Sequence, residues 1–166
     1  MAINTPLLIQ EYNPQWAANF QTIQKILRAA LVDLPVSIEH IGSTAIPGLA
    51  AKPIIDIDIA LQEHTAFDTI KKRLATIGYN HPGNQGIPGR EVFKRDATAA
   101  VQEVLDRVAH HLYVCPANSE ELQRHLRFRD YLLTHEDART HYEQLKYAIA
   151  EEANQDRKRY AVLKEI

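Results

Sequence analysis

Two aspartates separated by one residue form the pattern in this sequence that is best suited to chemistry. Asp56 and Asp58 lie in the apolar run 53–61, which predicts a buried strand. Alternate residues on a strand share one face and lie about 6.5–7 Å apart, so both carboxylates point the same way. Two buried carboxylates repel each other and lose hydration, and a cation or hydrogen-bond donors must compensate. Oxygen ligands of this kind suit Mg²⁺, which proteins usually bind through one or two carboxylates plus substrate phosphates.

A glycine–serine pair precedes these aspartates and could bind phosphate. Gly42 lets backbone N–H groups approach a phosphate closely, and the hydroxyl of Ser43 adds a donor. Twelve residues separate Ser43 from Asp56. The spacing differs from a Walker loop, because five residues separate Gly42 from Gly48 and Lys52 stands four positions further on. An ordinary turn is the alternative reading of the pair.

Two cations near these positions could bind the phosphate groups of a ligand. Lys52 comes just before the aspartate strand, and Arg90 follows a segment rich in glycine and proline. The planar guanidinium of Arg90 suits phosphate oxygens. A solvated surface position is the alternative for both cations. For the aspartate pair, the alternative is that one carboxylate caps a turn and the other forms a salt bridge.

The composition is ordinary for a globular protein and excludes several classes of function. The net charge of −2 gives no attraction toward nucleic acid or a membrane surface. The single cysteine, Cys115, excludes a disulfide framework and a multi-thiolate metal site, and its apolar neighbours predict a buried, inert thiol. We see no signal peptide or membrane span, and therefore expect a cytoplasmic protein without a membrane or nucleic-acid partner.

Alternating helices and strands must position the aspartates within the first 116 residues. Asn13-Pro14 predicts the start of a helix that ends near Leu34, and Gly78 should end a second helix over 67–77. The segment 42–52 predicts a loop with one helical turn after Pro47, and 81–89 a long loop. Residues 96–107 fit a helical turn or a hairpin. The expected strands are 36–41, 53–61, 91–95 and 108–115.

Helices dominate the sequence after residue 116. One begins near Ser119, a second begins at Thr134 with Asp137 as its capping partner, and a last piece includes 160–163. Helical spacing makes Tyr131 and Tyr142 predicted core residues rather than platforms for base stacking. Lys146 is expected to complement a helix end or an acidic neighbour. This order predicts one α/β or α+β domain over 1–166, with a mixed sheet and flanking helices in a core of about 13–116 and C-terminal helices over about 118–165.

The run from His40 to Asp58 resembles the signature of the GrpB family. The resemblance covers essentially the whole chain in order, and further matching segments are Gly86-Ile87-Pro88-Gly89-Arg90, His110-His111-Leu112-Tyr113-Val114, Phe128-Arg129-Asp130-Tyr131-Leu132, Tyr142 with Leu145-Lys146, and Tyr160 with Lys164. The family is usually grouped with the nucleotidyltransferase superfamily, so the resemblance implies a nucleotidyltransferase-like core. A similar domain occurs fused to some bacterial dephospho-CoA kinases.

The superfamily pattern has a Gly-Ser turn, a D-x-D strand and a third carboxylate on a neighbouring strand. Gly42-Ser43 and the pair Asp56 and Asp58 match the first two parts. In that superfamily such aspartates bind the divalent ion that bridges the triphosphate, for in-line displacement at the α-phosphate. The third part is missing, because the strand 108–115 contains no acid and His111 stands near the expected place. His110 and His111 should point to opposite faces, so only one of them faces the site.

These observations leave three functional hypotheses. The first is an Mg²⁺-dependent nucleotidyltransferase with Asp56, Asp58 and His111 as catalytic residues, both aspartates as metal ligands, and Gly42, Ser43, Lys52 and Arg90 as nucleotide ligands. The second is a non-catalytic module that binds a nucleotide-containing metabolite or a partner enzyme of coenzyme A synthesis. The third is a histidine–carboxylate metal site with hydrolase activity, built from Asp56, Asp58 and His111. The sequence does not distinguish the acceptor, the nucleobase or the oligomeric state.

Overall fold

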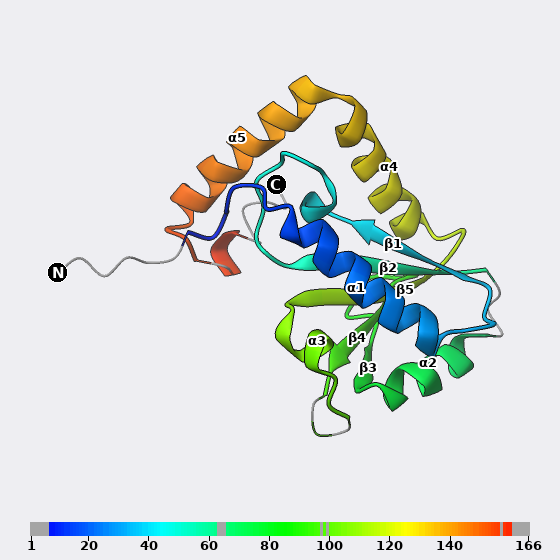
Figure 1. Cartoon of the computed structure of the whole chain (residues 1–166). Coiled ribbons are helices and arrows are strands. Elements are labelled where there is room, and N and C mark those ends of the chain that lie inside the picture. The colour runs from blue at the N-terminus through cyan, green and yellow to red at the C-terminus, as the bar shows by residue number, and fades with distance from the viewer. Residues whose placement is uncertain (1–6, 63–65, 97, 99, 157, 161–166) are drawn as a thin grey trace.

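A five-stranded mixed sheet lies at the centre of the molecule, as the computed structural model shows (Figure 1). The structure describes residues 7–62, 66–96, 98, 100–156 and 158–160. Strands β2 and β5 pair in parallel, whereas the other neighbouring strands pair antiparallel. The prediction of a mixed α/β fold is therefore confirmed. In spatial order the strands are β1 (Val36–Ile41), β2 (Ile55–Leu61), β5 (His110–Pro116), β4 (Glu91–Arg95) and β3 (Tyr79–Gly83).

Apolar side chains on one face of the sheet form the main core with three helices. Ile55, Ile57 and Ile59 of β2 are fully buried. They pack in one cluster with residues of α1 (Gln15–Ala30), α2 (Phe67–Thr76) and α3 (Glu103–Arg107). Burying one large aliphatic side chain contributes about 1.5–3 kcal/mol, so these three isoleucines fix which face of β2 points inward. The two aspartates of β2 must then occupy the opposite face.

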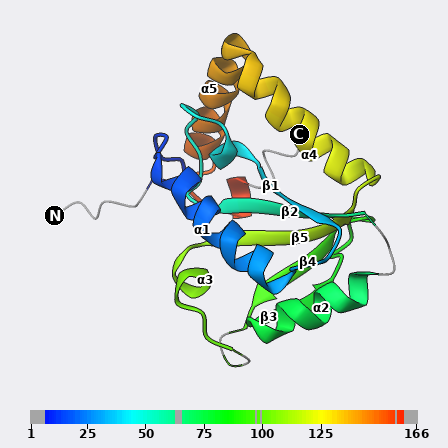
Figure 2. The ribbon, with the colours of Figure 1, turned by 45° about the vertical axis from the view of Figure 1, so that its right-hand side comes forward.

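The opposite face of the sheet is covered by α4 (Glu120–Thr134), and α5 (Glu136–Glu152) follows it at an angle (Figures 1 and 2). Both views show these two helices on the side of the molecule away from α2 and α3. The Oγ atom of Ser119 accepts a hydrogen bond from Leu122 N at 3.1 Å and caps α4, so the predicted start of this helix near Ser119 is confirmed. Leu122 then packs on Ala60 and Cys115 of the sheet. This contact seats α4 directly over the strands that carry the site.

Cys115 is fully buried, and the predicted inert thiol is confirmed. Burial, with a smaller contribution from the Asp58 carboxylate, raises the pKa of the Cys115 thiol to about 12. A thiol of this kind stays protonated at neutral pH and is a poor nucleophile. Within the described part of the chain, no helix combines the length and the apolar character that crossing a membrane requires.

Two predicted features near the site differ from the structure. Helix α1 ends at Ala30 rather than near Leu34, because Asp33 has a φ of 68° that no helix continues. The helical turn of the loop 42–52 precedes Pro47 instead of following it, and it is the 3₁₀ turn η1 (Ser43–Ala45). The turn therefore begins directly at the predicted phosphate-binding serine.

Other boundaries also differ from prediction. The first three residues of the predicted loop 81–89 belong to β3. Of the two alternatives open for 96–107, the structure has the helical one, the short helix α3. The strands β2 and β5 each begin two residues later than expected. Helix α5 begins at Glu136 with no capping pair, because Thr134 Oγ1 bonds the carbonyls of Asp130 and Tyr131 instead. Of the predicted last helical piece, Tyr160 is helical and buried, and Leu163 lies outside the described residues.

Candidate functional site

Strand pairing brings the predicted site residues into one row across the sheet. The parallel pairing of β2 with β5 places Asp56 opposite His111, and the antiparallel pairing of β2 with β1 places Asp56 opposite Ile41. Asp56 Oδ1 lies 2.9 Å from His111 Nδ1. Their side chains are 32% and 46% exposed, so this pair faces solvent. His110 points to the other face, and the predicted opposite orientation of the two histidines is confirmed.

The bend at Gly42 packs directly against the Asp56 carboxylate. Gly42 has a φ of 74°, which side chains rarely tolerate, and a Cβ at this position would lie 2.7 Å from Asp56 Oδ2. Glycine is therefore required for two reasons. The backbone conformation disfavours other residues, and the Asp56 carboxylate leaves no room for a Cβ atom. Ser43 follows as the first residue of η1. The Gly-Ser turn and the first aspartate are thus in contact, although twelve residues separate them in sequence.

Two hollows open on either side of Asp56. The smaller one, of about 170 Å³, contains the Gly-Ser turn, and the larger one has a volume of about 450 Å³. Both hollows share Gly42, Asp56, Phe128 and Tyr142 as lining residues. The smaller hollow is also lined by Ser43, Thr44, Ala51, Lys52, Ile54, His111 and Lys146. The larger hollow is also lined by Ile41, Arg90, Tyr113, Arg124 and His125.

Asp58 differs from Asp56, because it is completely buried beneath α4. Its Oδ2 atom lies 2.7 Å from His125 Nδ1, and His125 Nε2 lies 3.0 Å from Glu121 Oε1. Asp58 Oδ1 has no hydrogen-bond partner among the described residues. Burial raises the pKa of Asp58, and the hydrogen bond from His125 opposes that rise. The second predicted metal ligand is thus closed off from both hollows.

His125 and Glu121 were not predicted from the sequence. Burial alone would lower the pKa of His125, but the contacts with Asp58 and Glu121 outweigh it and leave the pKa raised. A protonated His125 compensates the two carboxylates on either side of it. Its position three residues after Leu122, on the face of α4 that packs on the sheet, was the signal available in the sequence.

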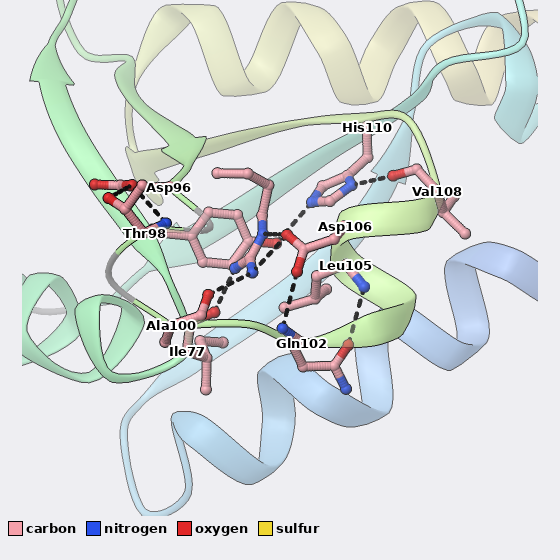
Figure 3. A network of polar contacts seen from close by, with 11 residues as sticks. Ile77, Asp96, Thr98, Ala100, Gln102, Leu105, Asp106, Val108 and His110 are labelled. Atoms are coloured by element: carbon pink, nitrogen blue, oxygen red, sulfur yellow. Dashed lines mark hydrogen bonds and ion pairs between the residues drawn. The ribbon is translucent and has the colours of Figure 1, made fainter.

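Figure 3 shows the polar contacts that hold the start of β5. His110 Nδ1 lies 2.7 Å from the carbonyl of Val108, and its Nε2 lies 2.6 Å from the hydroxyl of Tyr79. Arg95 binds Asp106 at 2.9 Å and stacks on the Tyr79 ring. Both ring nitrogens of His110 have a partner in this network, which anchors the start of the strand. Because side chains alternate, fixing His110 on one face also fixes His111 on the other.

The two predicted phosphate ligands lie in different hollows. Lys52 lines the smaller hollow, and its Nζ lies 4.9 Å from the centre of the Tyr160 ring. Arg90 lines the larger hollow, and its guanidinium carbon lies 4.5 Å from the centre of the Tyr113 ring. Arg90 Nε is buried without a hydrogen-bond partner among the described residues. Lys52 therefore shares a hollow with both Gly42 and Ser43, whereas Arg90 shares one with Gly42 but not with Ser43.

Two residues of α5 hold the loop that carries Lys52. Lys146 is 2% exposed, and its Nζ donates a hydrogen bond to the Ala50 carbonyl at 2.9 Å. Glu143 Oε1 accepts a hydrogen bond from Ala50 N at 2.9 Å. Of the two alternatives predicted for Lys146, the helix end is not observed, because Lys146 lies within α5 and its ammonium bonds the loop and lines the smaller hollow.

The tyrosine predictions are half right. Tyr131 is 54% exposed and stacks on His135, so it is not a core residue. Tyr142 packs against the cluster of Ile46, Leu49 and Leu132, and it also lines both hollows. The aromatic wall of the site is therefore formed by Tyr142 and Phe128, whose rings meet edge to face with 5.2 Å between their centres.

No group of three His, Cys, Asp or Glu side chains that could hold a metal occurs among the described residues. The hypothesis of a three-ligand site built from Asp56, Asp58 and His111 is not supported by this finding. The third strand carboxylate is also missing, since His111 occupies the position beside Asp56. One exposed carboxylate, Asp56, therefore remains available to a ligand in the hollows.

Comparisons with known proteins show which family this chain belongs to. The family model described as GrpB protein matches residues 6–166. UPF0157 protein YqkA of Bacillus subtilis is 33% identical over 139 residues, which are 84% of this chain and 38% of that protein. A dephospho-CoA kinase of Mycolicibacterium paratuberculosis is 29% identical over 180 residues, covering 96% of this chain and 44% of that protein. The chain thus spans less than half the length of both relatives.

Solved structures show the same architecture. The crystal structure of the conserved protein GrpB from Enterococcus faecalis superposes with a TM-score of 0.76 at 31% identity, covering 95% of this chain and 93% of that one. A structure of Cid1 in complex with its short product ApU gives a TM-score of 0.59 at 13% identity, covering 86% of this chain and 43% of Cid1. At that identity the likeness concerns the fold alone, which is nucleotidyltransferase-like. The match across residues 6–166 places this chain in the GrpB family.

Proposed function

We propose that this chain binds a nucleoside triphosphate together with Mg²⁺ and transfers its nucleotidyl group to an acceptor. The observation that carries the proposal is the contact between Gly42 and Asp56 at the rim of both hollows. It joins a small-residue turn suited to phosphate with an exposed carboxylate suited to a divalent cation. The fold supports the same reading, since Cid1 is a poly(U) polymerase, and one of its structures has MgGTP bound.

The carboxylate beside Gly42 fits one magnesium ion. Asp56 offers exposed carboxylate oxygens. Asp58 is buried and lines neither hollow, so Asp56 is the direct protein ligand in this proposal. Mg²⁺ commonly takes one or two carboxylates and completes its shell with water and substrate phosphates. When bound, the ion would neutralise phosphate charge and polarise the α-phosphate. The residues do not provide the three carboxylates of a two-metal site.

The residues of this chain have separate roles in the proposal. The Ser43 hydroxyl and the backbone of η1 bind phosphate oxygens, and Lys52 adds positive charge on the same side. His111 keeps the Asp56 carboxylate in place through the 2.9 Å contact. Burial of the phosphates between the sheet and α4 removes water that would compete with the acceptor.

Isothermal titration of the full chain with ATP, GTP, CTP and UTP, each with Mg²⁺, tests the proposal. We expect at least one triphosphate to bind below millimolar concentration, and Asp56→Asn to weaken that binding at least tenfold. Asp68→Asn is the matched control, because Asp68 is exposed on α2, away from both hollows. If no triphosphate binds at millimolar concentration, or if Asp56→Asn binds as well as the parent chain, the proposal is wrong.

A second candidate is a non-catalytic module that binds a nucleotide-containing metabolite. The histidine at the place of the third carboxylate favours it, as does the likeness to a dephospho-CoA kinase, which suggests a link to coenzyme A metabolism. The discriminating measurement is pyrophosphate release from the four triphosphates in the presence of a cell metabolite extract. Release that Asp56→Asn abolishes supports transfer, and binding without release supports the module.

A further inference from the structure

The larger hollow differs in chemistry from the smaller one. Three aromatic side chains line it, namely Tyr113, Phe128 and Tyr142, and so do the guanidinium groups of Arg90 and Arg124. Aromatic rings and guanidinium planes both stack on flat π-systems. The smaller hollow instead contains a hydroxyl pair and two ammonium groups, from Ser43, Thr44, Lys52 and Lys146. One hollow is suited to a flat ring and the other to oxyanions.

The volumes of the two hollows also suit them to different parts of a nucleotide. The smaller hollow, at about 170 Å³, is too small for a whole nucleotide, whereas the larger, at about 450 Å³, lies within the range of small-molecule sites. Asp56 and Gly42 line both hollows, so a ligand whose phosphates occupy one extends past Asp56 into the other. Phe128 and Tyr142 also line both and form a continuous wall.

The side chain of Arg90 is held in place in the larger hollow and has an unused hydrogen-bond donor. Its guanidinium is held over the Tyr113 ring at 4.5 Å, and its Nε has no hydrogen-bond partner among the described residues. A buried donor without a partner costs free energy that a ligand oxygen or ring nitrogen would recover. Arg124 is anchored differently, because both oxygens of Glu121 accept hydrogen bonds from its Nη2 at 2.9 Å.

We propose that the larger hollow receives the flat base of the nucleotide while the smaller hollow receives its phosphates. This inference rests on the proposed function and adds to it the residues that recognise the base. Phe128, Tyr142 and Tyr113 supply the stacking surfaces, and Arg90 supplies a hydrogen-bond donor to the base. An anionic acceptor in the larger hollow is the competing occupant, and the experiment below separates the two.

Titration of the full chain with two probes tests the division. The probes are the tightest-binding triphosphate of the four and inorganic tripolyphosphate, each with Mg²⁺. The base should make the nucleotide bind about tenfold tighter than tripolyphosphate. Arg90→Gln and Tyr113→Leu should remove most of that difference and leave tripolyphosphate binding unchanged, because both residues line the larger hollow and not the smaller one. Tyr131→Leu is the control, because Tyr131 is an exposed tyrosine that lines neither hollow.

The possible failures are distinguishable. If neither probe binds, the proposed function falls and this inference falls with it. If tripolyphosphate binds as tightly as the nucleotide, or if both variants weaken the two probes equally, the base does not occupy the larger hollow and the inference alone is wrong. Circular dichroism and the urea midpoint of each variant show whether a loss of binding reflects a loss of fold. A variant that unfolds is replaced by Arg124→Gln, whose side chain is 74% exposed.

Discussion

The buried carboxylate of Asp58 and the imidazole of His125 are joined at 2.7 Å across the interface between β2 and α4. This contact ties the C-terminal helices to the strand that carries the site. It also explains how a carboxylate with no exposed surface is tolerated in this sheet, because a hydrogen-bonded cation compensates most of the cost of burial. Asp58 therefore has a structural task that its exposed neighbour Asp56 does not share.

Replacing His125 with glutamine should destabilise the fold. The change removes a charged partner from a buried carboxylate, and we expect a loss of about 2–4 kcal/mol in the free energy of unfolding. Urea denaturation at neutral pH measures it, with His141→Gln, an exposed histidine on α5, as the control. Asp58→Asn should remove much of the penalty when combined with His125→Gln. Fully additive losses would show that the two residues are not coupled.

Alanine at Gly42 should have a different effect from alanine at Gly86. Both glycines have positive φ values, 74° and 85°, so both variants lose about 1 kcal/mol or more to backbone strain. A Cβ at Gly86 meets no atom within 4 Å, whereas a Cβ at Gly42 meets Asp56 Oδ2. Only Gly42→Ala should therefore weaken triphosphate binding, by tenfold or more in titration calorimetry. Equal binding by the two variants would contradict the role given to this contact.

Lys146 and Glu143 should behave as one unit. They bond the carbonyl and the N–H group of the same residue, Ala50. Lys146→Met should cost about 1–3 kcal/mol in urea denaturation, because it leaves a buried carbonyl without its donor. Lys71→Met, an exposed change on α2, should cost less than about 0.5 kcal/mol. The double variant Lys146→Met/Glu143→Ala should lose less than the sum of the single changes, and additivity would show independent contacts.

His40 should make the protein less stable in mild acid. Its ring stacks on Phe20, its Nε2 lies 2.9 Å from Thr44 Oγ1, and burial lowers its pKa from 6.5 to about 4, with Asp56 opposing and Arg129 assisting. Because the unfolded chain binds this proton more readily, the contribution of His40 is complete above pH 6.5 and is lost as the pH falls toward 4.

The stability difference between pH 7 and pH 5 measures this effect. The parent chain should lose about 1–2 kcal/mol more over that interval than His40→Gln, as determined from urea midpoints. The glutamine variant keeps a side chain that can bond Thr44 but does not titrate. If both chains lose the same stability, groups other than His40 cause the acid sensitivity.

The spacing of apolar residues predicted those parts of the fold that depend on neighbours close in sequence. Alternation in 53–61 was enough to place Ile57 in the core and Asp56 on the opposite face, and the helical spacing after Ser119 located α4. The family resemblance joined the Gly-Ser turn to Asp56 correctly. These predictions hold because the alternation of buried and exposed side chains is set within a few residues of sequence.

The rest of the site depends on contacts between distant residues. His125 lies 67 residues from Asp58, and Lys146 lies 96 residues from Ala50. The spacing of residues within a helix does not predict which distant carboxylate or loop the helix will contact. The exposed position of Tyr131 was missed for the same reason, since helical spacing identifies a shared face but does not say whether a neighbour covers it.

The alternation of side chains along β2 has a final consequence. The isoleucines that stabilise the core and the polar residues that would contact a ligand alternate along the same strand. A change in the register of β2 would therefore move both groups together. A slip of one residue would turn both acids toward the isoleucine layer and expose Ile57 to water. The apolar face of this strand therefore fixes the alignment of its polar face.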